Sequence, residues 1–290
     1  MIKLCAFADE ASEVLTAQIA ALQRNGISQI EVRNVNGKNV ADLTNEEAEE
    51  AYRTLQAGGI TVWSVGSPLG KVKLAEAEAH MARVRRVCEI AQLLHADRIR
   101  MFSFFEAYDD PAAVKHYLAE MCAIAKEHGV VMCHENEKGI YGDTLARVCE
   151  LADADIAGLQ LVFDPANYIQ CGIDTREAMD ALFDKIAYFH IKDVIAADGT
   201  LVPAGAGDGH IDEMIARIKA AGRDAVLTLE PHLRVFSGYA TIDDTVLQTK
   251  YSYATNDESF DAAVAALKAL LVAGGYTEQE NERGEKIWQA

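Results

Sequence analysis

Residues 130–139 read VVMCHENEKG, an apolar run that breaks into an imidazole, a carboxylate, an amide and a second carboxylate. The apolar half has the composition of a strand buried on both faces, as in a parallel sheet covered by helices. Ionisable groups beside such a strand are costly to bury unless a counter-charge pairs with them, and a metal ion is one such partner. The stretch therefore predicts a buried strand with a charged site at its end.

The same pattern recurs along the chain: a short β-rich run, a polar or glycine-containing break, then a helical stretch. Helix-start signals separate the runs, such as the capping box of Thr44 and Glu47 and the pair Asp110 and Pro111. Eight strands that alternate with about eight helices predict an α/β fold, a (β/α)8 TIM barrel in a single domain. The expected strands are 2–7, 29–34, 61–66, 98–103, 130–135, 159–164, 186–191 and 225–230.

A doubly wound open sheet is the competing architecture for this alternation. Such sheets usually carry a glycine-rich nucleotide fingerprint after the first strand. Residues 6–13, AFADEASE, contain no glycine, so the barrel is favoured.

We expect the barrel domain to span residues 1–275. It includes a long loop at 231–258 after the eighth strand, and loops of this length are often lids or oligomer contacts. Residues 276–290 are a charged tail that we expect to be peripheral.

The composition excludes some classes of partner. The chain has 290 residues, half of them hydrophobic, and a net charge of −18. This acidity disfavours nucleic acid and anionic membrane surfaces as partners. The six cysteines form no CxxC pair and the amino-terminal residues lack the features of a signal peptide, so we expect a reduced, cytoplasmic protein. No apolar run approaches the length of a membrane span.

Four consecutive expected strands end in residues able to bind a divalent cation. The carboxyl ends of barrel strands form the functional face, so these side chains should converge there. Polar residues at strand ends can also simply cap loops, an explanation that weakens when four of them occupy corresponding positions. Three carboxylates and one imidazole suit Mn²⁺ or Mg²⁺, with Co²⁺ or Zn²⁺ tolerated. The predicted metal ligands are Glu135, Asp164, His190 and Glu230.

The motifs around these residues resemble those of the xylose-isomerase-like TIM-barrel family of sugar isomerases and epimerases. The motifs are HENEKGIYGD, FDPANY, FHIKD, GAGDGHI and LEPH, and the resemblance covers nearly the whole chain. It implies that the four predicted ligands hold one divalent metal ion, with Mn²⁺ favoured. It also implies that Glu135 and Glu230 share the acid and base roles, and that the protein forms a homo-oligomer.

The chain departs from part of the family at residue 167. The ketose 3-epimerases that it resembles place a histidine shortly after the aspartate of the sixth strand, whereas this chain has Asn167. The D-P-x-N form instead resembles inosose-dehydratase-like members. Endonuclease IV shares the fold, but the extra histidines of its trinuclear zinc site are not evident here, so DNA repair is not expected.

The expected activity is that of a metal-dependent isomerase or epimerase of a free sugar or keto-sugar. A metal ion would polarise the substrate carbonyl and stabilise an enediolate, with Glu135 and Glu230 as the catalytic proton-transfer groups. The alternative is a metal-dependent dehydratase of an inosose-like keto-polyol. A non-catalytic binding barrel is the third interpretation.

Four further residues are candidate substrate contacts. For each of them, a purely structural role is the alternative. Lys192 follows His190 by two residues, so a continuing strand would turn it inward. Trp63, together with Phe7, could form an apolar wall for a sugar ring, although aromatics inside barrels more often belong to the core. The candidates are Lys192, Asn167, His232 and Trp63.

Two interior features are expected to be structural. Glu31 and Arg100 lie within strands and should form an ion pair, because an unpaired buried charge is costly. The loop 203–211, PAGAGDGHI, has three glycines but no lysine or arginine, so phosphate binding is not favoured there. An unphosphorylated polyol or keto-sugar fits this chain better.

Overall fold

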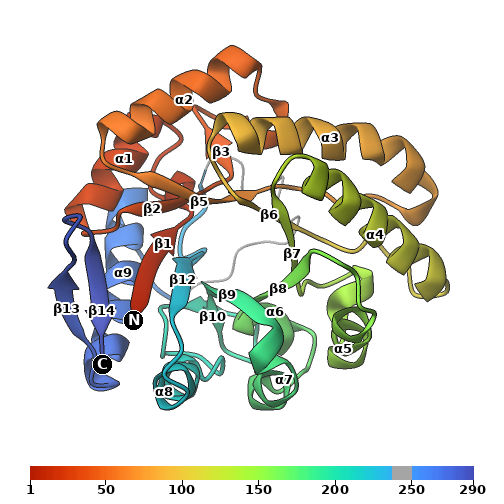
Figure 1. Cartoon of the computed structure of the whole chain (residues 1–290). Helices are drawn as coiled ribbons and strands as arrows, with labels where there is room; N and C mark the ends of the chain where they lie inside the picture. Colours follow the sequence, from red (N-terminus) through yellow and green to blue (C-terminus); the bar gives the residue numbers. More distant parts are fainter. Residues whose placement is uncertain (237–249) are drawn as a thin grey trace.

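The computed structural model describes residues 1–236 and 250–290. In this part of the chain, eight parallel strands pair side by side, and β1 pairs with β12, so the ring is closed. The predicted (β/α)8 barrel is therefore confirmed (Figure 1). The strands of the ring are β1 (Ile2–Ala6), β2 (Gln29–Val32), β5 (Thr61–Gly66), β6 (Arg98–Met101), β7 (Val131–Glu135), β8 (Leu159–Phe163), β9 (Ile186–Ile191) and β12 (Ala225–Leu229).

Helices surround the ring and pack their apolar faces on its outer surface (Figure 1). The predicted start signals operate as expected: Thr44 and Glu47 form a capping box, and the Asp110 side chain accepts from the Ala113 N–H. The α-helices among the described residues are α1 (Leu15–Arg24), α2 (Asn45–Ala57), α3 (Ala77–Leu93), α4 (Pro111–Glu127), α5 (Leu145–Asp153), α6 (Pro165–Gln170), α7 (Thr175–Leu182), α8 (Ile211–Ala220) and α9 (Asn256–Ala273). None of these described helices is long and apolar enough to cross a membrane.

Shorter elements follow three of the barrel strands at their carboxyl ends. A 3₁₀ turn, η1 (Ala8–Glu10), follows β1 directly. Two small hairpins lie in connections, β3 (Asn34–Val35) with β4 (Lys38–Asn39) and β10 (Asp193–Val194) with β11 (Leu201–Val202).

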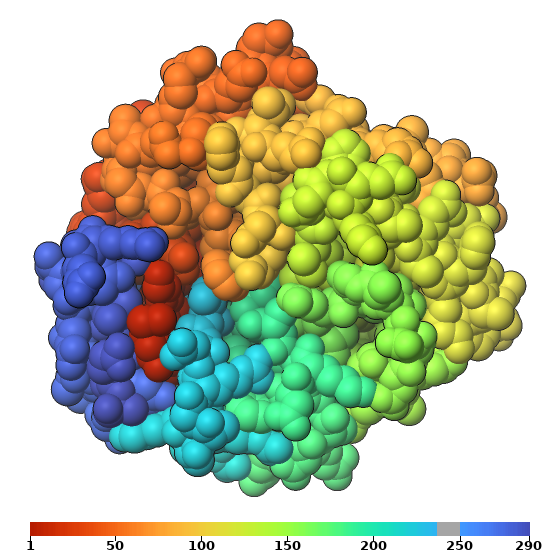
Figure 2. Space-filling view, in the orientation of Figure 1, coloured from red at the N-terminus to blue at the C-terminus, as the bar shows by residue number. Residues whose placement is uncertain are grey.

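The carboxyl-terminal residues form a hairpin that packs on the start of the barrel. It consists of β13 (Thr277–Glu280) and β14 (Lys286–Gln289), and Trp288 pairs with Ile2 of β1. Trp288 is buried, and the space-filling view shows these blue residues against the red amino terminus (Figure 2). The division into a domain at 1–275 and a tail at 276–290 stays a prediction.

The predicted long loop at 231–258 is described only in part. Residues 231–236 and 250–255 are described, and α9 begins at Asn256. Residues 237–249, which include Tyr239, lie outside the described residues, so the suggested lid or oligomer contact stays a prediction.

Gly70 allows the loop after β5 to pack closely on the backbone of the loop after β6 at the mouth of the barrel. Gly70 has φ of +83°, and a Cβ placed there would lie 2.1 Å from the Phe102 carbonyl oxygen. We expect Gly70→Ala to lower the free energy of unfolding by on the order of 3 kcal/mol, because left-handed strain and overpacking add. Gly129→Ala is the control, since Gly129 has φ of +71° but no atom within 4 Å of the added Cβ. Equal losses for the two variants in urea unfolding would contradict this account.

Candidate metal centre

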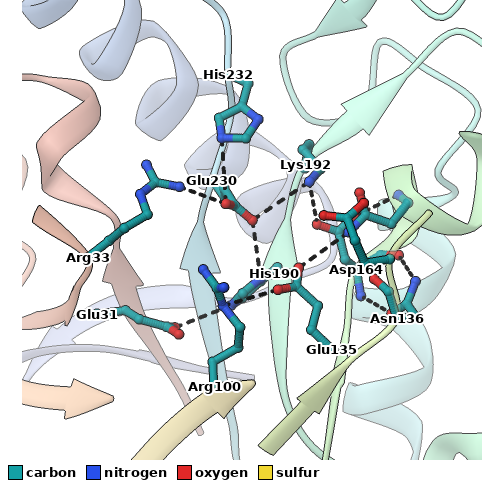
Figure 3. A network of polar contacts seen from close by, with 12 residues as sticks. Glu31, Arg33, Arg100, Glu135, Asn136, Asp164, His190, Lys192, Glu230 and His232 are labelled. Atoms are coloured by element: carbon teal, nitrogen blue, oxygen red, sulfur yellow. Dashed lines mark hydrogen bonds and ion pairs between the residues drawn. The ribbon is translucent and has the colours of Figure 1, made fainter. Parts of the chain in front are cut away.

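The ends of four neighbouring strands converge at the carboxyl end of the barrel (Figure 3). Glu135 closes β7, Asp164 follows β8, His190 lies near the end of β9, and Glu230 follows β12. Each side chain offers one ligand atom, and these four atoms lie within 4.8 Å of one another. All four residues are buried, with at most 3% of their surface exposed. Parallel pairing therefore brings the four predicted ligands together.

The imidazole of His190 is held in the orientation of a metal ligand. Its Nδ1 lies 2.9 Å from Glu135 Oε1 and 3.2 Å from Glu230 Oε2. Its Nε2 lies 3.2 Å from Glu31 Oε2. Metal-bound histidines generally donate their second ring N–H to a carboxylate in this way. Glu31 thus fits the role of an orienting group for His190, with Nδ1 facing the other carboxylates.

Two carboxylate oxygens in this group fit a cation better than a hydrogen-bond donor. Asp164 Oδ2 and Glu230 Oε2 are buried and accept no hydrogen bond of normal geometry. The ammonium of Lys192 lies 2.9 Å from Asp164 Oδ2 and 3.7 Å from Glu230 Oε2. Burial would lower the pKa of His190, but Glu135 and Glu31 outweigh burial and raise it well above its usual value, so without an ion the imidazole also carries positive charge. Three carboxylate oxygens and one imidazole nitrogen suit a divalent ion of the Mn²⁺ or Mg²⁺ kind, with Zn²⁺ tolerated. The residues present therefore fit one ion.

The charges of the group are strongly coupled. Burial would raise the pKa of Glu135, but His190 and Arg100 outweigh burial and lower it. Burial would also raise the pKa of Glu230, and Lys192 and His190 outweigh it, so this pKa falls well below its usual value. Both glutamates therefore remain anionic, as metal ligands must be.

Lys192 and Asp164 form the outer part of the same network. Burial would lower the pKa of Lys192, but Asp164 and Glu230 outweigh burial and raise it well above its usual value. Burial raises the pKa of Asp164 to about 7, although Lys192 opposes that shift. An ion among these oxygens would favour the anionic form of Asp164, so ion binding and proton release are linked.

The mouth beside this group is a small polar cavity of ≈ 20 Å³. Lys192, Asn167 and His232 all line it, as predicted for substrate contacts, and Lys71 and Glu137 lie there as well. A larger cavity of ≈ 290 Å³ lies elsewhere, lined by residues of α7 and α8. We assign the site to the smaller cavity, because only that one is lined by the convergent carboxylates.

Asn167 and His232 contact three of the predicted ligands. Asn167 Nδ2 lies 3.4 Å from Glu135 Oε1, and its backbone N–H donates to Asp164 Oδ1 at 2.9 Å. His232 Nε2 lies 3.5 Å from Glu230 Oε1. His232 also has φ of +46°, a strained backbone that is common at functional sites.

Trp63 does not reach the site, and its predicted substrate contact is corrected. The indole packs edge-to-face on Tyr188 with ring centroids 5.9 Å apart, and the Arg98 guanidinium lies 3.9 Å above it. Arg98 is the first residue of β6, so Trp63 lies toward the opposite end of the barrel. Phe7, which was grouped with Trp63, does lie at the site, with its ring edge-to-face against His190 at 5.2 Å.

The expected ion pair between Glu31 and Arg100 is replaced by other pairings. Arg100 Nε lies 3.1 Å from Glu135 Oε2. Glu31 instead accepts a hydrogen bond of 2.9 Å from the Tyr188 hydroxyl and contacts His190. Both buried charges are therefore paired, as expected, but with different partners.

Several residues of the site were missed because only the last four strands were searched for strand-end ligands. Arg33 follows β2, and its Nη1 donates to Glu230 Oε1 at 2.8 Å. Asp9 and Glu10 follow β1 and both contact Arg33. The strand-end rule, applied to the first two strands, would have found all three.

A second group of possible ligands surrounds Glu230 on its other side. Glu10, Glu230 and His232 also place one ligand atom each within 4.8 Å of one another. The guanidinium of Arg33 lies 3.3 Å from Glu10 Oε1 and 2.8 Å from Glu230 Oε1. Arg33 thus already supplies the cation of this group, so we assign one ion to the site.

The glycine-rich loop binds a carboxylate of the chain itself. Asp193 accepts backbone N–H groups of Gly205, Gly207 and Gly209 at 2.8, 3.1 and 2.9 Å. A Cβ at Gly207 would lie 2.4 Å from Asp193 Oδ1, so the close approach requires glycine. The loop therefore anchors Asp193, the residue next to Lys192.

A family model described as xylose isomerase-like TIM barrel matches residues 19–269. No curated protein matches the chain in sequence. Among solved structures, D-psicose 3-epimerase in the presence of D-fructose is similar with a TM-score of 0.75 and 15% identity, covering 94% of this chain and 99% of that one.

Two further structures extend this comparison. The probable 3-DHS dehydratase AsbF of Bacillus anthracis, involved in petrobactin synthesis, has a TM-score of 0.68 and 17% identity, with 92% and 99% of the two chains covered. The IOLI protein with a binding zinc atom has a TM-score of 0.71 and 17% identity, with 92% and 97% covered. At such identities the likeness shows the fold alone.

Proposed function

The chain belongs to the xylose isomerase-like TIM barrel family, and on this premise we propose that it is a metal-dependent isomerase or epimerase of a free sugar or keto-sugar. The proposal includes one divalent ion, Mn²⁺ by preference, held by the four predicted ligands. It also includes a homo-oligomeric assembly and a cytoplasmic location. Proteins of similar structure include an epimerase and a probable dehydratase, so the reaction must be argued from the site.

One observation carries the proposal. Four side chains from four successive barrel strands place one ligand atom each within 4.8 Å of one another. Two of the carboxylate oxygens are buried and accept no hydrogen bond of normal geometry from the described residues. Burying three carboxylates together costs free energy unless a cation compensates them. The ammonium of Lys192 and the guanidinium of Arg100 supply part of that charge, and a divalent ion would supply the rest.

The proton-transfer groups of the proposed reaction are the two glutamates. When bound, the ion would act as a Lewis acid that polarises the substrate carbonyl. Glu135 and Glu230 come from β7 and β12, which are separated in the ring by β8 and β9. One carboxylate removes the proton beside the carbonyl and the other returns a proton to the opposite face, which gives an epimer. A single carboxylate that moves the proton between adjacent carbons gives an aldose–ketose isomer.

Lys192, Asn167 and His232 are the proposed substrate contacts. They line the same mouth as the two glutamates and bear ammonium, amide and imidazole groups that can hydrogen-bond sugar oxygens. The ammonium of Lys192 can in addition stabilise negative charge that develops on a substrate oxygen.

Dehydration of a keto-polyol is the second candidate, favoured by Asn167. The amide of Asn167 is engaged by Glu135 and by the Asn136 carbonyl, 2.9 Å away. An amide cannot serve as a proton acceptor in the way that a histidine at this place could. Loss of a β-hydroxyl after proton removal would then give a lyase on the same site.

Proton exchange in D₂O tests the proposed function. The protein, loaded in turn with Mn²⁺, Mg²⁺, Co²⁺ and Zn²⁺, is incubated with a panel of ketoses and keto-polyols. Deuterium at an inverted carbon identifies an epimerase, deuterium in an aldose–ketose pair identifies an isomerase, and loss of water identifies the lyase. Absence of exchange and of bound metal with all four ions would refute both enzyme proposals.

Removal of the Lys192 ammonium at the mouth should affect ion binding and turnover in opposite directions. We expect Lys192→Met to bind Mn²⁺ about tenfold more tightly, since a positive charge next to Asp164 and Glu230 is lost. Turnover should fall by about 10²-fold, because the proposed charge-stabilising contact is lost. Calorimetric titration and initial rates measure the two effects, with Lys126→Met on the exposed side of α4 as control. Weaker Mn²⁺ binding, or unchanged turnover, would contradict this role.

A further inference from the structure

Each carboxylate of the metal centre has one oxygen held by the chain and one that faces the other ligands (Figure 3). For Glu230, Oε1 accepts from Arg33 Nη1 at 2.8 Å, whereas Oε2 lies 3.2 Å from His190 Nδ1. For Glu135, Oε2 lies 3.1 Å from Arg100 Nε, whereas Oε1 lies 2.9 Å from His190 Nδ1. The two glutamates are thus each flanked by one arginine on one side and the shared imidazole on the other.

Asp164 follows the same rule with a different donor. Its Oδ1 accepts the backbone N–H of Asn167 at 2.9 Å, and its Oδ2 lies 2.9 Å from Lys192 Nζ on the side of the other ligands. Three oxygens and the imidazole nitrogen therefore face one another. On the outer side, Glu230 Oε1 accepts a hydrogen bond from Arg33, Glu135 Oε2 forms an ion pair with Arg100, and Asp164 Oδ1 accepts the Asn167 N–H.

Arg33 is fixed more firmly than an ordinary ion-pair partner. Its Nε and Nη2 bind the two oxygens of Asp9, both at 2.9 Å. The guanidinium lies between two aromatic rings, 4.4 Å from the Phe7 centroid and 4.9 Å from the Phe236 centroid. Only 2% of the residue is exposed. The fork to Asp9 leaves Nη1 directed at Glu230.

Arg100 is fixed by a similar set of contacts. Its Nη1 donates to the Ser67 carbonyl at 2.9 Å, and its guanidinium lies 4.7 Å from the Phe102 centroid and 5.5 Å from the Phe7 centroid. Phe7 thus contacts both arginines, each of which approaches its own glutamate.

We propose that Arg33 and Arg100 are positioning residues that keep Glu230 and Glu135 as single-oxygen ligands and thereby reserve two coordination positions for substrate. The inference rests on the proposed metal centre. Mn²⁺ and Mg²⁺ prefer octahedral coordination, so four protein atoms leave about two positions. These positions would be open to the carbonyl and an adjacent hydroxyl of a keto-sugar. A glutamate without its arginine can bind through both oxygens and would occupy one of these positions.

This role differs measurably from simple structural support. If the arginines only stabilise the fold, their loss should leave the number of water molecules bound to Mn²⁺ unchanged. If they restrict the glutamates, that number should fall, because a second glutamate oxygen takes the place of a water. Mn²⁺ binding should then be as tight as in wild type or tighter, because a positive charge leaves and a ligand oxygen is gained.

Water-proton relaxation of bound Mn²⁺ is the test, with Mn²⁺ alone as the probe. Arg33→Gln alone would leave Asp9 buried without its cationic partner, so the double variant Arg33→Gln/Asp9→Asn is compared with Asp9→Asn, which retains the Arg33 guanidinium. Arg100→Gln is a second, independent variant. Arg98→Gln, at the opposite end of the barrel beside Trp63, is the matched control.

We expect one exchangeable water on Mn²⁺ in the two site variants, Arg33→Gln/Asp9→Asn and Arg100→Gln. Wild type, Asp9→Asn and Arg98→Gln should have two. The water-proton relaxation of the site variants should therefore be about half that of wild type. Mn²⁺ affinity in the site variants should equal or exceed that of wild type. Two waters in both site variants would overturn the arginine inference and leave the metal centre intact. Failure of wild type to bind Mn²⁺ would instead refute the metal centre and, with it, this inference.

Discussion

Glu135→Gln and Glu230→Gln should each lower the rate of proton exchange by about 10³-fold or more, because each removes a proposed proton-transfer group and a metal ligand together. An amide is close in size to a carboxylate, and both sites have donors on the outer oxygen, so the fold should tolerate the change. Exchange of deuterium into the active ketose, measured by NMR at saturating Mn²⁺, gives the rate.

The control for these two variants is Glu127→Gln at the exposed end of α4, where the carboxylate pairs with Arg85. This variant should exchange at the wild-type rate. A near-normal rate in Glu135→Gln or Glu230→Gln, at an Mn²⁺ concentration that saturates the variant, would remove that glutamate from the proposed mechanism.

Removal of the ion should abolish activity and lower stability. Without an ion, the buried carboxylates repel one another, and ligand binding to the native state alone adds RT ln(1 + [L]/Kd) to the free energy of unfolding. At an Mn²⁺ concentration of about 100 times Kd, this stabilisation is about 2.7 kcal/mol. Thermal unfolding with chelator and with Mn²⁺ measures the difference, and activity should return when Mn²⁺ is restored.

Asp164→Asn is the matched variant for the stability measurement. Oδ2 of Asp164 is an inner oxygen, so its loss should remove most of the stabilisation by Mn²⁺ while the metal-free protein unfolds much as before. An equal increase in unfolding temperature for wild type and Asp164→Asn would show that Mn²⁺ stabilises the protein from another place.

The ring of strands could be predicted because its signal is local. Each barrel strand is a short apolar run between a helix end and a helix start, and the capping signals at Thr44 and Asp110 mark such starts. Parallel strands also align their carboxyl ends, so strand-end residues such as Glu135 and Asp164 could be placed together from order alone.

Two predictions failed because the alternation of a strand does not give a residue's position along the barrel axis or its distance to side chains of other strands. The alternation of a strand predicts that Trp63 faces a given side, but not whether it lies near the amino or carboxyl end of the barrel. Likewise, Glu31, Arg100 and Glu135 all turn inward, and only distances across the barrel decide that Arg100 pairs with Glu135 rather than Glu31. Arg33 lies far from Glu230 in sequence, so this contact depends on closure of the ring.

Anomalous diffraction from a crystal soaked in Mn²⁺ tests the central claim most directly. The account predicts one strong manganese peak at the mouth of the barrel, with Glu135, Asp164, His190 and Glu230 as its protein ligands and His190 bound through Nδ1. A peak bound elsewhere, or no peak at these four side chains at a saturating concentration, would contradict it.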